Sequence, residues 1–186
     1  HKGRALMGRV VKGFQSQKPY ETGTRILKGL ELASPYSWQL AFRDRLPSKS
    51  YSQPARALCP VLVGNTGSSG ISAAANEDGS DGTVRVSAAN LNCAFIAADF
   101  SQDPHKPLFT ARSSTGTTAF RVIDGENHST IAMKDKGPRS PETLDLIQRA
   151  LEIGDADFDA WARECDHATR LVTGKAESED EGYKVA

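Results

Sequence analysis

Two short segments of the chain carry the side chains best suited to moving a proton. Residues 78–86 are DGSDGTVRV, and residues 124–131 are DGENHSTI. The imidazole of His128 suits a general base, because it can take a proton from a hydroxyl nucleophile and return it to a leaving group. A carboxylate that accepts a hydrogen bond from the other ring nitrogen fixes the tautomer and stabilises the imidazolium. We predict that Asp81 is this acid and that His128 is the base.

The neighbouring carboxylate Asp78 is the alternative acid. Asp81 is favoured because it directly precedes the Gly-Thr-Val sequence. Either carboxylate could instead bond its own backbone in an Asx-turn, and His128 could be an ordinary turn histidine. With Glu77 nearby, the acids lack the alternating spacing and the final Glu of an EF-hand loop, and residues 64–70 lack the Gly-Lys-Ser/Thr ending of a phosphate-binding loop. We therefore expect neither a metal nor a cofactor.

Both segments follow predicted strands, and this places them where sheets carry chemistry. The apolar run 58–63 is bounded by turn residues, which is typical of a strand buried on both faces. Residues 117–123 are predicted to be another strand, which ends in the turn 124–128. Open α/β sheets bind ligands at the carboxyl ends of their strands. An acid followed by a histidine is also the chain order of the last two members of a Ser–Asp–His triad.

The rest of the pattern predicts helices that alternate with strands. Serine followed by proline predicts helix starts at Ser34 and Ser140, and Gly154 predicts the end of the second helix. A third helix is expected from the apolar side chains that share one face, Phe158, Trp161, Ala162 and Cys165. Residues 92–100 are predicted to be a strand, and 47–56 and 101–107 to be loops. The sequence therefore predicts an α/β fold with a largely parallel sheet.

Three segments resemble the C-terminal part of bacterial α/β-hydrolase lipases and esterases. They are VLVG at 61–64, DGTV at 81–84 and GENHS at 125–129. In that family a strand ending in Gly precedes the loop of the triad acid, and a later Gly-x-Asn/Asp-His sequence carries the base. The resemblance covers roughly residues 55–135. It implies an α/β-hydrolase fold, with Asp81 and His128 as members of its triad.

The resemblance also implies a division of the chain. Residues 1–173 would form the C-terminal part of a single α/β-hydrolase domain. Within them, roughly 5–50 would be the lid-like helical segment that such enzymes insert between nucleophile and acid, and 140–170 would be closing helices. Residues 174–186 are acidic and polar, and we expect them to be a disordered tail.

The nucleophile of the family is absent from this sequence. No Gly-x-Ser-x-Gly elbow occurs, and the nearest look-alike, GSSG at 67–70, has the wrong spacing and follows the strand that leads to the acid. The chain also begins His-Lys-Gly-Arg without an initiator Met, so we expect it to be processed, truncated or incompletely represented. We therefore expect the serine and the oxyanion-hole donors upstream of His1, in an N-terminal half of the same or a separate chain. Localisation is left unassigned.

Serine-hydrolase-type hydrolysis of acyl-ester or lipid substrates is the predicted function. The missing nucleophile motivates an alternative, a non-enzymatic regulatory or binding fragment derived from a hydrolase fold. Amide or thioester cleavage is a third possibility, since the fold alone does not choose the substrate. The 23 basic and 23 acidic residues balance, which argues against nucleic-acid binding. The longest apolar runs are too short to cross a bilayer.

The remaining reactive side chains are expected to be structural. The cysteines are too few and too scattered for a disulfide framework or a zinc site. Cys59 and Cys93 lie in predicted strands, so we expect both to be buried as small apolar residues. His105 lies in a predicted loop and His167 on the last predicted helix, and we expect both to face solvent.

Overall fold

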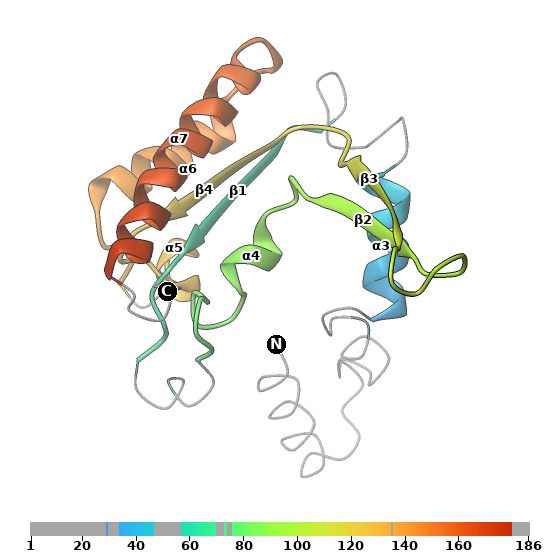
Figure 1. Cartoon of the computed structure of the whole chain (residues 1–186). Coiled ribbons are helices and arrows are strands. Elements are labelled where there is room, and N and C mark those ends of the chain that lie inside the picture. The colour runs from blue at the N-terminus through green and yellow to red at the C-terminus, as the bar shows by residue number, and fades with distance from the viewer. Residues whose placement is uncertain are drawn as a thin grey trace, which may run out of the picture.

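The computed structural model describes residues 29, 34–46, 57–69, 73, 76–134 and 136–179, with side chains to residue 175. All of the predicted loop 47–56 and most of the lid-like segment 5–50 lie outside the described residues. Figure 1 shows the elements, which in chain order are α3 (Pro35–Asp44), β1 (Cys59–Gly64), α4 (Val86–Ala89), β2 (Ala94–Asp99), β3 (Leu108–Ser113), β4 (Thr118–Ile123), α5 (His128–Ile131), α6 (Pro141–Glu152) and α7 (Asp155–Glu179).

A parallel pair of strands forms the centre of the fold. β1 and β4 pair in register from Cys59 opposite Thr118 to Gly64 opposite Ile123. The two strands therefore end side by side, and the segments that follow them start from the same edge of the sheet (Figure 1). This pairing bears out the parallel arrangement that the sequence predicted for the two strands flanking the candidate motifs.

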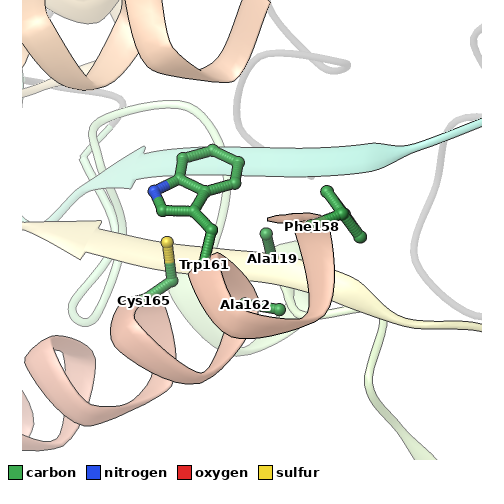
Figure 2. Close-up of a cluster of buried hydrophobic side chains, with 5 residues drawn as sticks. All are labelled: Ala119, Phe158, Trp161, Ala162 and Cys165. Carbon is green, nitrogen blue, oxygen red and sulfur yellow. The ribbon is translucent and has the colours of Figure 1, made fainter. Parts of the chain in front are cut away.

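Helix α7 closes one side of this pair. Its residues Phe158, Trp161, Ala162 and Cys165 are buried and pack against Ala119 of β4 (Figure 2). They are the face that the sequence predicted for the last helix. The phenyl and indole rings meet edge to face with centroids 6.2 Å apart, a favoured aromatic geometry.

The outer edge of β4 is also covered by α7. The Thr169 hydroxyl accepts a hydrogen bond from the Val122 amide at 3.0 Å and donates one to the Phe120 carbonyl at 3.2 Å. These backbone groups would otherwise be available to a further strand. The Thr169 side chain thus satisfies two backbone groups of β4.

The second pair of strands departs from the predicted sheet. β2, which the sequence predicted, pairs antiparallel with β3, which the sequence did not reveal. The two strands form a hairpin of their own beside α3 (Figure 1). The prolines of the connecting loop favour a chain reversal there, and strands joined in this way pair antiparallel. Of the two sheets in the described part of the chain, one is parallel and one antiparallel.

Helix boundaries agree with the sequence except at the C-terminus. The side chains of Ser34 and Ser140 cap α3 and α6 as predicted. Helix α7, however, continues to Glu179, so the predicted disordered tail cannot begin at residue 174. The reason is local propensity, since Lys, Ala and Glu follow Gly174 and favour a helix. Residues 180–186 lie outside the described part.

The cysteines only partly follow the expectation. Cys59 begins β1 and is half-buried, and Cys165 is buried in the α7 core. Cys93 is exposed, because it precedes β2 in a hairpin whose strands are themselves mostly exposed; its predicted burial was wrong. The three thiols are free. Among the helices of the described residues, none combines the length and apolar character needed to cross a bilayer.

Candidate active site

The loop before α4 holds the Asp81 side chain in one orientation. The carboxylate oxygen Oδ1 accepts hydrogen bonds from the amides of Thr83 at 3.0 Å and Val84 at 2.7 Å. The Asp81 amide donates to the Val84 carbonyl, which closes the turn. Gly82 has φ +87°, a left-handed conformation that favours glycine. The loop therefore forms the Asx-turn considered from the sequence, and it still leaves Oδ2 free for another partner.

The exit of β4 positions His128. Gly125 turns the chain with φ +77°, and Asn127 then caps the short helix α5, of which His128 is the first residue. The Asn127 side chain accepts from the amides of Ser129 and Thr130, and Thr130 Oγ1 accepts from the Asn127 amide. This reciprocal capping box fixes the backbone on which the imidazole is carried.

The two predicted site residues meet across these loops. His128 Nδ1 lies 3.1 Å from Asp81 Oδ2, and the His128 amide donates to the Asp81 carbonyl at 3.0 Å. The Asp81 side chain is 4% exposed, whereas that of His128 is 47% exposed. A carboxylate in contact with Nδ1 favours the tautomer with the proton on that nitrogen, so Nε2 is left as the acceptor. The arrangement is that of a buried acid orienting a base whose ring reaches solvent.

The rival residues are placed elsewhere. Asp78 is exposed and has no part in the contact with His128. His105 and His167 are exposed, as predicted. Within the described residues there is no group of three His, Cys, Asp or Glu side chains placed to hold a metal ion.

The serines of the GSSG look-alike, Ser68 and Ser69, are not hydrogen-bonded to the His128 ring. Ser68 packs under Gly82: a Cβ on that glycine would lie 2.5 Å from the Ser68 hydroxyl. Of the described side chains, only Asp81 is hydrogen-bonded to the His128 ring. The described part of the chain therefore contains an acid–base pair without a hydroxyl or thiol hydrogen-bonded to the base.

A buried carboxylate beside the pair was missed from the sequence. Glu126 is 1% exposed, although glutamates in turns are usually solvated. Its Oε1 accepts from the amides of Arg139 at 2.7 Å and Ser140 at 3.3 Å, and from the Thr143 hydroxyl at 3.0 Å. Burial raises the pKa of Glu126, but these bonds and the nearby Thr130 hydroxyl lower it, so the net pKa lies below 4.5. No local sequence signal marks this residue, because its partners come from a later segment.

Comparison with known proteins identifies a structural likeness. No known family model and no curated protein sequence matches the chain. A solved structure of the phospholipase PlaB from Legionella pneumophila resembles it at 25% sequence identity with a TM-score of 0.66, over 94% of this chain and 38% of that chain. The structure of the same phospholipase in complex with thio-NAD resembles it at 24% sequence identity with a TM-score of 0.65, over 92% of this chain and 38% of that chain. The chain thus has a mixed α/β fold similar to part of a phospholipase, and it spans less than half of that chain.

Proposed function

We propose that this chain contributes the acid and the base of a serine hydrolase that cleaves lipid or other acyl esters. Asp81 orients the imidazole and stabilises its protonated form, and His128 transfers the proton. The nucleophilic serine is supplied from outside this sequence, by an N-terminal half of the same or a separate chain. The observation that carries the proposal is the contact of 3.1 Å between His128 Nδ1 and the buried Asp81 carboxylate.

Three further observations support this assignment. The acid is buried and the base is half-exposed, so Nε2 can be reached by a hydroxyl from another segment. The acid and base follow the parallel strands β1 and β4, at the end of the sheet where α/β folds place their sites. The structural likeness is to part of a phospholipase, which favours a lipid ester over an amide or thioester substrate.

The experiment that tests the proposal is labelling with a fluorophosphonate, followed by intact-mass analysis under denaturing conditions. We expect one adduct on a species larger than 20.0 kDa or on a separate partner chain. His128→Ala should slow labelling and ester hydrolysis by several orders of magnitude, because a triad without its base loses that much. His105→Ala is the matched control, since that imidazole is exposed and away from the pair. Equal activity of the two variants would refute the role of His128.

The non-enzymatic alternative rests on a specific feature, the absence of a described hydroxyl or thiol hydrogen-bonded to His128. It predicts a chain of 20.0 kDa that melts cooperatively, remains unlabelled by the fluorophosphonate and hydrolyses no ester. An adduct whose formation depends on His128 excludes it. An unlabelled and cooperatively folded protein would make a binding or regulatory role the better explanation of the fold.

A further inference from the structure

Glu126 lies at a junction of three segments of the fold. Its carbonyl oxygen accepts a hydrogen bond from the Thr66 amide at 3.0 Å, which joins it to the chain leaving β1. The same carbonyl approaches Gly64 so closely that a Cβ there would lie 2.0 Å from it. The Glu126 side chain is hydrogen-bonded to a third segment, the start of α6. His128 follows Glu126 by two residues. The chain just before His128 is therefore held at Glu126 by two segments, the exit of β1 through the Glu126 carbonyl and the start of α6 through its carboxylate.

The start of α6 is bound to this one carboxylate. Helix N-termini carry a partial positive charge, so they favour a nearby anion. Here two amides and the Thr143 hydroxyl converge on Oε1. Oε2 is buried and has no hydrogen-bond partner among the described residues, so the bonds all run through one oxygen. Arg139 adds a second tie, because its guanidinium donates to the Gly125 carbonyl.

Loss of the hydrogen bonds of the Glu126 carboxylate would affect His128 through a short stretch of backbone. Asn127, which caps α5, is the sole residue between Glu126 and His128. The His128 ring, in contrast, is half-exposed, and among the described side chains Asp81 is its one polar contact. A shift of the backbone at residue 126 would thus move the imidazole of His128 relative to Asp81, the described side chain that orients it. Displacements of about 1 Å cost on the order of a hundredfold in rate at other active sites.

We propose that Glu126 is a positioning residue, whose buried carboxylate binds the histidine loop to the start of α6 and so keeps the His128 ring aligned with Asp81. Its catalytic meaning rests on the proposed hydrolase function. The alignment itself does not, because it can be observed on the imidazole without any substrate.

Two substitutions of Glu126 separate its contacts from its size. Glu126→Ala removes the acceptor of all three donors. Glu126→Gln keeps an oxygen in nearly the same place and loses the charge, so it should retain part of the alignment. Thr143→Val removes one donor without changing the volume, and it remains informative if Glu126→Ala fails to fold. Cys165→Ala is the control for loss of stability, since that thiol is buried in the α7 core (Figure 2) and has no hydrogen bond to the pair.

The first readout is the tautomer of His128, measured on the complete protein by long-range ¹H–¹⁵N correlation of the ring nitrogens. We expect a single Nδ1-protonated tautomer in the native protein and in Cys165→Ala. Glu126→Ala should give an average of tautomers, with Thr143→Val and Glu126→Gln between the two. The second readout is ester hydrolysis, where Glu126→Ala should lower kcat on the order of 10- to 100-fold and change KM less than about twofold.

The outcomes distinguish the two proposals. An unaltered ring tautomer in the Glu126 and Thr143 variants overturns the positioning role, whatever the activity. Equal changes in those variants and in Cys165→Ala, at matched loss of stability, also overturn it, because they would reflect general loosening. Altered tautomers in a protein that hydrolyses no ester would leave the positioning role intact and reject the hydrolase function.

Discussion

Asp81→Asn is the substitution whose effect the structure defines best. The side-chain oxygen Oδ1 accepts from the amides of Thr83 and Val84, at 3.0 and 2.7 Å. An asparagine must keep its carbonyl oxygen in that place, because its NH₂ group would otherwise face two backbone donors. The NH₂ group is then directed at His128 Nδ1, where Oδ2 stood. Nδ1 must accept, the proton moves to Nε2, and the base can no longer take a proton from a hydroxyl.

The size of the effect follows from this reversal. Conversion to the wrong tautomer costs about 10⁴-fold in kcat in the serine-protease precedent, which is about 5 kcal/mol on the barrier. The loop itself should survive, since both backbone hydrogen bonds are kept. Their weakening from a charged to a neutral acceptor should lower the free energy of unfolding by about 1–2 kcal/mol. The catalytic loss should therefore far exceed the loss of stability.

The assay is ester hydrolysis and fluorophosphonate labelling by the complete enzyme, at a temperature where circular dichroism shows both proteins folded. Asp78→Asn is the matched control, because it makes the same chemical change three residues earlier on an exposed side chain. We expect the control to keep native activity. Activity of Asp81→Asn within tenfold of native would refute the reasoning, since it would mean that the Asp81 contact does not set the tautomer of the base.

Three further predictions concern stability, each measured by chemical or thermal denaturation. Gly64→Ala should destabilise the protein by about 1–3 kcal/mol or more, because its Cβ would meet the Glu126 carbonyl at 2.0 Å, whereas Gly154→Ala has open space and should change little. Thr169→Val should lower the free energy of unfolding by about 1–3 kcal/mol, because it leaves the Val122 amide and the Phe120 carbonyl of β4 unpaired. The exposed Thr173→Val should cost under about 0.5 kcal/mol, and equal effects of the two substitutions would contradict the role of Thr169. The pKa of Glu126 lies below 4.5, so the folded state binds fewer protons there than the unfolded state. Its contribution to stability is present above pH 4.5 and is lost as the pH falls through the lowered pKa. Glu126→Gln should flatten this part of the plot of unfolding free energy against pH. An unchanged slope would count against a charged, buried Glu126.

The contact between Asp81 and His128 could be predicted because short local patterns encode it. An apolar run ending in Gly predicts β1, and the glycine-rich loop after it predicts a turn that can aim the Asp81 carboxylate. The same logic applies to β4 and the turn that leads to His128. Once both strands are parallel neighbours, the two loops must meet at one edge of the sheet. The distance between two residues 47 positions apart thus follows from two local patterns and one pairing rule.

Features that depend on partners distant in the sequence could not be predicted. Strand β3 lacks a regular alternation of apolar and polar side chains, so its local sequence does not predict a strand. Its strand conformation depends on the antiparallel pairing with β2. In helix α6 the buried side chain is Thr143, whereas the apolar side chains Leu144 and Leu151 remain exposed. The buried Thr143 hydroxyl donates a hydrogen bond to Glu126. The local sequence of neither residue predicts that contact.

The described residues include several contacts that hold Asp81 and His128 in place. The Asp81 loop is closed by its own backbone, and the His128 backbone is tied to that loop, to β1 through Thr66 and to α6 through Glu126. Groups preorganised in this way need no rearrangement when a reaction begins. For the proposed hydrolase, assembly of the site then requires a hydroxyl beside the half-exposed imidazole, together with the oxyanion-hole donors. Substitutions at these contacts should therefore act on the rate of proton transfer, through the tautomer and the position of His128. Substitutions at the surface that receives the serine segment should instead act on whether the site is complete.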